Sequence, residues 1–409
     1  QPTRRLNVAY LDRWAVSAIL SPMPKNVAIL GSTGSIGTSA LRVLEPLGPD
    51  FRVVALAARD SIEALAEQVR RFRVPHAAVT NPKKADAFRR LLGDVPCRIH
   101  AGPDALEEMA VLDEVDIVLT AVVGAAGLPA VLRAAEKGKT LAIANKEPLV
   151  IAGRLLTETA RAHGARILPI DSEHSAVFQT LQAGDRRDVR RIILTASGGP
   201  FRNARPEDLA AVRPQQALAH PTWNMGPKIT IDSATMMNKA LEILEAVWLF
   251  DVPVEKVDVL IHPESIVHSM VEFVDGAIVA QLGTPDMTVP IQYALTYPRR
   301  RPSPAAALRL EDLGCLTFER PDTTLFRSLE LAYEVARLGG TAPAVFNAAN
   351  EVAVDAFLAD RITFAHIVET VEACLEAHTV KAEPDLDDLY EADAWARDHA
   401  GQRAHAVGR

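Results

Sequence analysis

The chain has 409 residues and a formal net charge of −8. This length predicts two or three domains, and the acidic balance argues against a nucleic-acid-binding surface. The three cysteines, Cys97, Cys315 and Cys374, lie far apart and form no CxxC motif or Cys/His cluster. The pattern therefore predicts neither a disulfide framework nor a zinc site, and we expect a reducing compartment, the cytoplasm.

The sequence predicts no membrane span, because its longest uncharged run, residues 117–132, is too short and contains glycines and a proline. Residues 1–22 precede the first predicted strand, and we expect them to form an extension outside the fold or an ordered arm. A secretory signal is not expected there, because Asp12 and Arg13 interrupt the apolar residues.

The first predicted strand, residues 25–30, leads directly into the glycine-rich segment GSTGSIG at residues 31–37, and a helical pattern follows. A strand, a glycine turn and a helix are the context of a dinucleotide-binding loop, in which small residues let the backbone approach a pyrophosphate. The spacing is GxxGxxG and not GxGxxG, so a tight turn without a ligand remains an alternative.

The second predicted strand, residues 51–58, ends at Arg59 and Asp60. An acidic residue at this place binds the ribose 2′-hydroxyl of NAD, whereas an arginine accommodates the 2′-phosphate of NADP. Arg59 favours NADP, and Asp60 leaves NAD possible.

Further predicted strands at residues 77–80, 117–123 and 140–144 alternate with helical segments. This alternation indicates a Rossmann-like, doubly wound parallel sheet. We expect this first, nucleotide-binding domain to span residues 23–171.

Two strand-like runs end in polar clusters, which should face the cofactor crevice at the carboxyl edge of the sheet. Asn145, Lys146 and Glu147 follow one run, and the segment Asp171-Ser172-Glu173-His174 follows another. If the second segment stays extended, its two carboxylates point to the same side, and with a third carboxylate they suit Mg²⁺ or Mn²⁺. Alternatively, Asp171 is only the N-cap of the next helix.

A helix is predicted within the stretch 229–249, and Ser233 or Thr235 can cap its start. Asn238 and Lys239 would lie in its first turns. A helix N-terminus with a hydroxyl, an amide and a lysine is a good site for a phosphate group.

Glu242 lies on the same face of this predicted helix, one turn further on. A phosphate would repel this carboxylate. Its position makes sense if a cation lies between the two, or if Lys239 simply pairs with it.

The middle of the chain carries a loop without periodicity, residues 219–227, which contains Trp223. This tryptophan is either a core anchor or part of a lid over the substrate. Strands are predicted at residues 190–195 and in three runs between residues 257 and 282. We interpret His262 and His268, which lie near these strands, as structural residues.

The predicted architecture is α/β: an N-terminal Rossmann-like sheet, a central α+β catalytic domain and a C-terminal helical bundle. The central domain would span residues 172–296. A linker at residues 297–322 would lead to the helical domain, residues 323–409. The helical part contains the polar motif NAANE, residues 347–351, which we interpret as asparagines at a helix junction.

Together these features predict a metal-assisted enzyme that uses a nicotinamide nucleotide on a phosphorylated substrate. The sequence resembles the 1-deoxy-D-xylulose 5-phosphate reductoisomerase family from residue 25 to the C-terminal helices. Seven motifs in series carry this resemblance: GSTGSIG, ANKE, DSEH, ASGGPF, HPTWNMG, DSATMMNKALE and NAANE.

The resemblance implies rearrangement of 1-deoxy-D-xylulose 5-phosphate to a branched aldehyde, followed by reduction with NADPH to 2-C-methyl-D-erythritol 4-phosphate. It also implies a homodimer and a divalent metal, Mg²⁺ or Mn²⁺. The metal would be held by Asp171, Glu173 and Glu242, and these residues with Lys146 would form the catalytic group.

The resemblance assigns the remaining site residues as well. The lid would be residues 220–227. Those expected around the phosphorylated substrate are Lys146, Ser172, Glu173, Ser197, His220, Trp223, Ser233, Asn238, Lys239 and Glu242. Those expected around NADPH are Thr33, Gly34, Ser35, Ile36, Arg59, Asn145, Glu147 and Gly226.

Two other functions remain open from the sequence. One is a dehydrogenase of small phosphorylated or amino-acid-derived substrates that uses NADP without a metal. The other is a nucleotide-sensing protein without turnover, although such a protein has no need of three carboxylates and two lysines together. Arg59 to Ser61 departs from the family pattern, which leaves the 2′-phosphate contacts the least defined.

Overall fold

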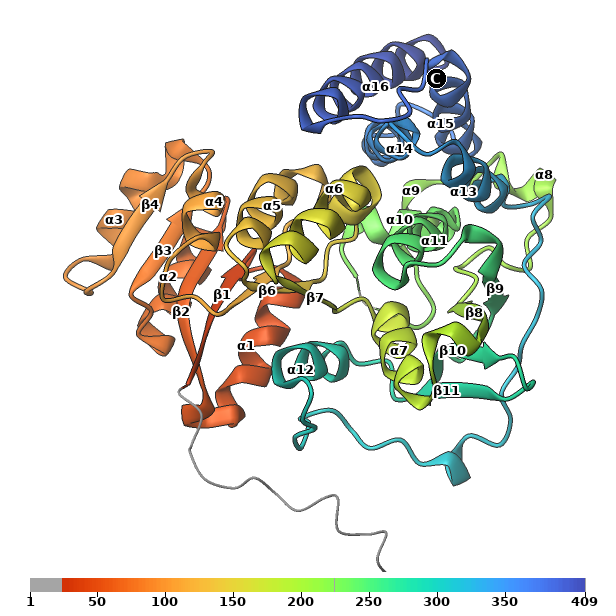
Figure 1. Cartoon of the computed structure of the whole chain (residues 1–409). Helices are drawn as coiled ribbons and strands as arrows, with labels where there is room; N and C mark the ends of the chain where they lie inside the picture. The colour runs from red at the N-terminus through yellow and green to blue at the C-terminus, as the bar shows by residue number, and fades with distance from the viewer. Residues whose placement is uncertain (1–23, 224, 409) are drawn as a thin grey trace, which may run out of the picture.

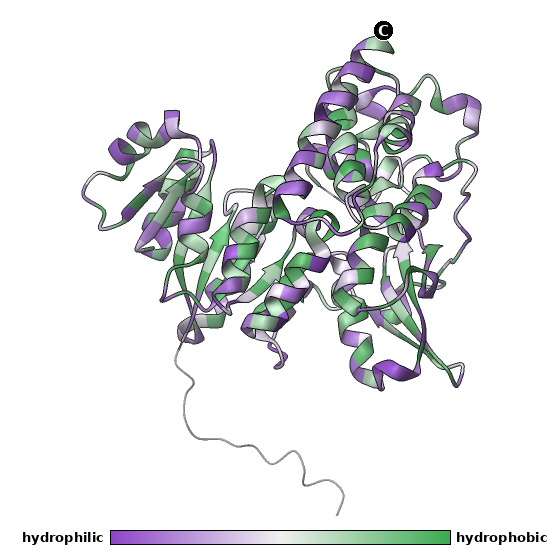
Figure 2. Cartoon of the chain, turned by 45° about the horizontal axis from the view of Figure 1, so that its top comes forward, coloured by the Kyte–Doolittle hydropathy of each residue, from purple (hydrophilic) through white to green (hydrophobic). Residues whose placement is uncertain are grey.

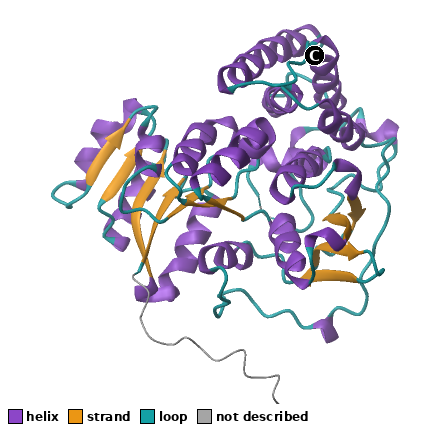
Figure 3. Ribbon diagram, viewed as in Figure 1, coloured by secondary structure: helices purple, strands orange, loops and turns teal. Residues whose placement is uncertain are grey.

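The computed structural model describes residues 24–223 and 225–408, so the predicted extension at residues 1–22 lies outside the described part. Figure 1 shows two groups of strands side by side, each with its own helices, and a set of C-terminal helices above them. In Figure 3 the strands of the two groups are clearly separate, and the C-terminal set contains only helices.

The first group is a seven-stranded sheet in the order β4-β3-β2-β1-β5-β6-β7, and every neighbouring pair is parallel. The predicted doubly wound sheet is therefore confirmed, and β4 is a strand that the sequence pattern did not indicate. The strands are β1 (Lys25–Leu30), β2 (Phe51–Ala58), β3 (His76–Val79), β4 (Arg98–Ala101), β5 (Ile117–Thr120), β6 (Thr140–Ile143) and β7 (Arg166–Pro169).

Strand β1 shows why this sheet carries helices on both faces. Its last four residues are fully buried, and successive side chains enter two different cores: Val27 and Ile29 one, Ala28 and Leu30 the other. A strand buried on both faces requires a parallel sheet with a helical layer on each side. The helices of this part are α1 (Ser35–Leu47), α2 (Ile62–Phe72), α3 (Ala85–Leu92), α4 (Ala105–Ala110), α5 (Leu128–Glu136) and α6 (Glu147–His163).

One helix from later in the chain joins this layer. Helix α12 (Thr288–Thr296) falls within the predicted central domain, but its Ile291, Ala294 and Leu295 are buried in the core that contains α1. Figure 1 shows α12 beside α1. The chain therefore returns to the first sheet after the second has been completed, and the domain boundaries stay a prediction.

The second group is a four-stranded mixed sheet in the order β11-β10-β8-β9. Its strands β8 and β9 are parallel, whereas β10 runs antiparallel to β8 and β11. This part contains α7 (Ser172–Thr180), β8 (Val189–Ala196), α8 (Pro206–Leu209), α9 (Pro214–Ala217), α10 (Pro227–Ala234), α11 (Met237–Phe250), β9 (Val257–Ile261), β10 (Val267–Phe273) and β11 (Ile278–Leu282).

The helix predicted within residues 229–249 is present as α11, and α10, which the sequence pattern did not indicate, precedes it. Helix α10 ends at Ala234, and Met236 adopts a left-handed conformation with φ of 58° before α11 begins at Met237. Ser233 therefore lies in the last turn of α10, and it is not an N-cap. The break matters, because it creates a second helix N-terminus directly before Asn238.

The C-terminal part is helical, as predicted, and packs on both other parts. Its helices are α13 (Arg327–Leu338), α14 (Ala342–Leu358), α15 (Ala365–Ala377) and α16 (Leu386–Ala406). In Figure 2 the strands of the first sheet are green, whereas purple residues appear on the outer sides of the helices. Within the described residues, no helix is both long and apolar enough to span a membrane.

Candidate active site

A cluster of five charged side chains, which we call the carboxylate cluster, lies between the carboxyl edge of the first sheet and helices α7 and α11. Lys146 follows β6, and Asp171 follows the neighbouring strand β7, so both side chains leave the carboxyl edge of the first sheet. The Lys146 Nζ atom lies 2.5 Å from Asp171 Oδ2 and 3.1 Å from Glu242 Oε1, which comes from α11. The five members of the carboxylate cluster are Lys146, Asp171, Glu173, Lys239 and Glu242.

The other lysine completes this arrangement. Lys239 Nζ lies 2.8 Å from Glu173 Oε1 and also forms a short ion pair with Glu242. Asp171 stands at the N-cap position of α7, but its side chain makes no capping hydrogen bond. The alternative interpretation of Asp171 as a mere cap is therefore not supported.

Burial and crowding make this cluster electrostatically strained. Burial, together with the neighbouring Asp171 and Glu173, raises the pKa of Glu242 to about 7. Burial alone would raise the pKa of Asp171 too, but the ammonium of Lys146 and the ring of His174 hold it below its usual range. One carboxylate of the three thus lacks sufficient positive charge around it.

The cluster fits a divalent cation. Oxygen atoms of Asp171, Glu173 and Glu242 all lie within 4.8 Å of one another, and all three offer the hard oxygen ligands that Mg²⁺ and Mn²⁺ prefer. Three carboxylates face only two lysines, and a cation would supply the missing charge. The three predicted ligands are therefore brought together, in the vicinity that the sequence suggested.

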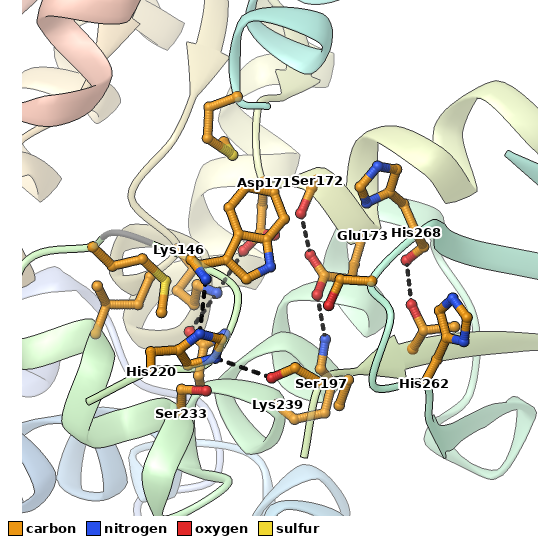
Figure 4. A pocket seen from close by; sticks show the side chains of 18 of the residues that line it. Lys146, Asp171, Ser172, Glu173, Ser197, His220, Ser233, Lys239, His262 and His268 are labelled. Atoms are coloured by element: carbon orange, nitrogen blue, oxygen red, sulfur yellow. Dashed lines mark hydrogen bonds and ion pairs between the residues drawn. The ribbon is translucent and has the colours of Figure 1, made fainter. Parts of the chain in front are cut away.

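Beside the carboxylate cluster lies a cavity lined by hydroxyl, amide and imidazole groups (Figure 4). Ser197 Oγ lies 3.0 Å from His220 Nε2. Asn238 and Lys239 are in the first turn of α11, and Ser233 comes from the last turn of α10. The predicted substrate residues that line this cavity are Lys146, Ser172, Glu173, Ser197, His220, Trp223, Ser233, Asn238 and Lys239.

Trp223 and Met225, from the segment predicted to be a lid, line this cavity. His220 fixes the start of the loop, because its Nδ1 atom accepts hydrogen bonds from the backbone N–H groups of Thr222 and Trp223, at 3.1 and 2.9 Å. The Trp223 ring centre lies 6.4 Å from that of His268. Trp223 is therefore part of the cavity wall and not an anchor of a separate core.

His262 and His268 also line the cavity. The Nε2 atom of His262 accepts hydrogen bonds from the backbone N–H groups of Ile266 and Val267, both at 3.1 Å. Its other ring nitrogen lies 2.8 Å from the carbonyl oxygen of Thr317. The structural role predicted for His262 agrees with these contacts.

A second, adjoining cavity extends from the carboxylate cluster towards the glycine segment. Gly31 has φ of +89°, and a Cβ atom on Gly37 would lie 2.3 Å from the carbonyl oxygen of Gly31. The loop thus folds tightly onto the start of α1, whose N-cap residue Gly34 has no side chain to occupy the free N–H groups. Such an end suits the phosphates of a dinucleotide.

The donor groups of this second cavity fit a nicotinamide nucleotide. The side chain of Asn145 is buried, yet neither its nitrogen nor its oxygen has a hydrogen-bond partner in the structure. An amide with both groups unpaired is the complement of a carboxamide or ribose. The predicted cofactor residues that line this cavity are Gly34, Ser35, Ile36, Asn145, Glu147 and Gly226.

Two predicted cofactor residues lie outside this lining. Thr33 belongs to the same glycine turn. Arg59 lies at the end of β2, where its side chain is 81% exposed and pairs with Asp60 at 3.5 Å. An exposed side chain at the end of this strand can reach a phosphate group bound at the edge of the sheet.

Sequence reasoning missed several charged residues next to the site. His174 Nε2 lies 3.0 Å from the backbone oxygen of Glu242, and its Nδ1 lies 3.3 Å from Glu245 Oε2. Burial lowers the pKa of His174 to about 4. The motif DSEH contains His174, but only the fold brings it to α11. Lys228, which follows the lid, was also missed.

These features are typical of one class of protein, the metal-assisted oxidoreductases that act on phosphorylated substrates. The features are a Rossmann-like sheet, a carboxylate cluster that fits a divalent cation, and a cavity whose donor groups suit an anion. Comparison with known proteins gives the particular family. The family model for 1-deoxy-D-xylulose 5-phosphate reductoisomerase matches residues 27–153, and two C-terminal domain models of the same family match residues 167–250 and 282–399.

Curated relatives extend along nearly the whole chain. The 1-deoxy-D-xylulose 5-phosphate reductoisomerase of Symbiobacterium thermophilum is 53% identical over 385 residues, which cover 93% of this chain and 99% of that protein. The reductoisomerase of Chlorobium phaeovibrioides is 50% identical, over 91% of this chain and 98% of that protein. The chain belongs to the 1-deoxy-D-xylulose 5-phosphate reductoisomerase family.

Solved structures agree. The Zymomonas mobilis enzyme in complex with NADPH has a TM-score of 0.88 and 44% identity, over 94% of this chain and all of that one. A reductoisomerase in complex with NADPH, fosmidomycin and magnesium has a TM-score of 0.89 and 41% identity, over 93% and 98% of the two chains. The predicted family, fold class and enzyme class are confirmed.

Proposed function

We propose that the chain converts 1-deoxy-D-xylulose 5-phosphate to 2-C-methyl-D-erythritol 4-phosphate with NADPH and a divalent metal. The observation that carries this proposal is the position of the carboxylate cluster. It lies between a cavity suited to a phosphorylated sugar and a cavity suited to a nicotinamide nucleotide, and Lys146 and Asn238 line both. Hydride donor and acceptor can therefore meet beside the cluster.

Asp171, Glu173 and Glu242 would hold the metal. A bound divalent cation supplies Lewis-acid polarisation of substrate oxygens, which favours both a carbon–carbon rearrangement and hydride attack on an aldehyde. Lys146 lines both cavities, and its Nζ atom would donate hydrogen bonds to substrate oxygens once a metal takes the carboxylates of Asp171 and Glu242, which it contacts here. The attraction of Asp171 and Glu242 outweighs burial and raises the pKa of Lys146, so it acts as a positive donor and not as a base.

The phosphate group would bind at the start of α11. Free N–H groups of that helix, the side chains of Asn238 and Lys239, and the hydroxyls of Ser197 and Ser233 converge there. These contacts are remote from the reacting carbons, so their binding energy can be used to orient them. The loop that carries Trp223 would exclude water from the aldehyde intermediate.

NADPH would supply the hydride. Gly34, Ser35 and Ile36 would bind its pyrophosphate at the start of α1, and the unpaired amide of Asn145 would bind its nicotinamide end. Arg59 is the residue that we assign to the 2′-phosphate. These assignments place the reduced ring at the edge of the carboxylate cluster.

The test of the proposed function follows the oxidation of NADPH directly by its absorbance. Purified chain is mixed with NADPH and 1-deoxy-D-xylulose 5-phosphate, with and without Mn²⁺, after treatment with a chelator. We expect NADPH oxidation only when metal and sugar phosphate are both present. Equal oxidation after chelation would favour the metal-free dehydrogenase, and NADPH binding without any turnover would favour the sensor.

We also propose a cytoplasmic homodimer. Strand β11 lies at the edge of the mixed sheet, and its two end residues are exposed, Ile278 to 52% and Leu282 to 36%. An exposed apolar edge strand is a ready site for pairing with a second copy. Sedimentation of the parent and of Ile278→Lys would test this pairing, because a lysine on the edge should shift the chain towards the monomer.

A further inference from the structure

The motif NAANE, residues 347–351, has no part in the proposed function, yet two of its polar side chains point towards the active site. It lies on α14 of the C-terminal part. Asn350 is fully buried, and its Nδ2 atom donates a hydrogen bond of 2.8 Å to Asp232 Oδ1 on α10. A helix far along the chain thus holds a helix that begins directly after the lid.

Asp232 also forms an ion pair with a lysine on its own helix. Its other carboxylate oxygen lies 2.8 Å from Lys228 Nζ, one turn earlier on α10, and Asp232 itself is 1% exposed. Lys228 Nζ also lies 3.1 Å from Glu147 Oε1, the first residue of α6. Asn350, Asp232, Lys228 and Glu147 therefore form one continuous buried chain, which we call the support network.

Three of the four residues of the support network line the predicted NADPH cavity. Glu147, Lys228 and Asp232 line that cavity, whereas Asn350 does not. Glu147 follows Lys146, so its position also affects the carboxylate cluster. Lys228 follows Gly226 and Pro227, so it anchors the C-terminal end of the lid.

The neighbouring residue Glu351 lies against another segment of the same cavity wall. A Cβ atom on Gly124 would lie 2.9 Å from Glu351 Oε1, and Gly124 has φ of +73°. This glycine follows Val122 and Val123, which line the cavity. Arg397 of α16 holds the carboxylate of Glu351 at 2.8 Å. Adjacent residues of α14 thus lie against two segments of the cavity wall.

We propose that Asn350 is a positioning residue for NADPH, which acts through Asp232 to fix Lys228 and Glu147. This inference rests on the proposed NADPH site and deepens it: the C-terminal helices set the shape of a cavity to which they contribute no lining residue of their own. Asn350 would act on NADPH binding by fixing positions and not by contacting the nucleotide. If Asp232 were not held by Asn350, Lys228 would be less firmly placed, and the C-terminal end of the lid and Glu147 would both lose a fixed contact.

The experiment measures NADPH binding by fluorescence titration of the full chain, without sugar phosphate, for the parent and for Asn350→Leu, Lys228→Met and the double variant. Leucine has the branching and the number of heavy side-chain atoms of asparagine but donates no hydrogen bond. We expect each single variant to raise the Kd for NADPH roughly tenfold, as is typical when a buried charged group loses a partner. The double variant should add little to either single one, because both break the same chain.

Steady-state kinetics separate positioning from general damage. Asn350→Leu should raise KM for NADPH while kcat at saturating NADPH and KM for the sugar phosphate stay near the parental values. Lys228→Arg should restore most of the affinity. The control is Ser328→Ala, which removes a buried hydrogen bond of 2.7 Å to the carbonyl of Thr235 at the other end of α10. It should lower thermal stability and leave the Kd unchanged.

Three results would overturn the inference. The first is an unchanged Kd in folded Asn350→Leu. The second is an additive loss in the double variant, and the third is an equal loss in Ser328→Ala, which would mean that only helix stability matters. A parent that does not bind NADPH would overturn the proposed function and this inference with it.

Discussion

The carboxylate cluster and the support network adjoin at the neighbouring residues Lys146 and Glu147, yet their electrostatics differ. Two lysines lie among the carboxylates of the cluster, and one lysine, Lys228, lies between the carboxylates of the network. In the support network Lys228 outweighs the effect of burial and lowers the pKa of Glu147. In the carboxylate cluster, burial and neighbouring carboxylates raise the pKa of Glu242 to about 7. In the support network one lysine thus keeps Glu147 ionised, whereas in the carboxylate cluster two lysines leave Glu242 with a raised pKa, which a cation from outside would lower. Strain of this kind marks the site of chemistry.

The largest effect should come from substituting the strained carboxylate. We expect Glu242→Gln to lower kcat on the order of a thousandfold, because loss of the metal removes several kcal/mol of charge stabilisation. NADPH oxidation with saturating Mn²⁺ measures this. Glu158→Gln, an exposed glutamate on α6, is the control and should retain parental activity. A Glu242→Gln enzyme with parental kcat would contradict the contrast between the two networks.

A second prediction concerns pH and stability in the chelated chain. Because the pKa of His174 is about 4 when folded, the unfolded chain binds a proton below the ordinary histidine pKa of about 6.5 and the folded chain does not. The contribution of His174 to stability should therefore fall as pH decreases from about 6.5 to 4, by up to about 1.4 kcal/mol per pH unit, while the raised pKa of Glu242 acts in the opposite direction. Urea unfolding of the parent and of His174→Gln isolates this contribution: the free energy of unfolding of the parent relative to the variant should fall as pH decreases, and a difference that does not change with pH would exclude His174 as the cause.

The glycine turn offers a test of the nucleotide cavity that leaves both networks intact. Gly37→Ala would place a Cβ atom 2.3 Å from the carbonyl of Gly31, so the turn must shift. We expect a loss of stability of about 1–2 kcal/mol and a roughly tenfold rise in the Kd for NADPH. Gly401→Ala on α16 has open space around it and should be neutral or stabilising. Unchanged NADPH binding in Gly37→Ala would show that NADPH does not bind at the glycine turn.

The smallest effect is expected at the exposed end of the cofactor site. Arg59→Ala should weaken NADPH roughly fivefold and leave NADH unchanged, because an exposed ion pair with a phosphate is partly screened by solvent. The ratio of kcat/KM for the two nucleotides measures this. If NADPH and NADH weaken equally, Arg59 does not contact the 2′-phosphate.

Much of the site could be predicted because its residues follow local patterns. The glycine turn follows a strand, and Lys146 and Asp171 follow the ends of neighbouring parallel strands, so the alternation of strands and helices predicts their meeting. Helix α10 and the left-handed residue Met236 could not be predicted, because a continuous apolar periodicity gives no sign of a break between two helices. The predicted cap Thr235 lies next to the observed start of α11, and the phosphate site at that start stays a prediction.

The features that the sequence did not reveal depend on contacts between distant segments. Helix α12 returns to the first sheet, and Asn350 reaches Asp232 across 118 positions. Neither contact leaves a periodic trace, because a buried asparagine in an apolar helix has the same pattern whether it caps a junction or holds an active-site helix. The motif NAANE was noticed for its polarity, but its partner required the fold.

The most direct test of this account is a Mn²⁺ titration of the parent and of Glu242→Gln, followed by electron paramagnetic resonance of the free ion. The account predicts one tightly bound Mn²⁺ per parent chain, and its loss in Glu242→Gln while NADPH binding is retained. Equal Mn²⁺ binding by both proteins would contradict the claim that the three carboxylates form the metal site.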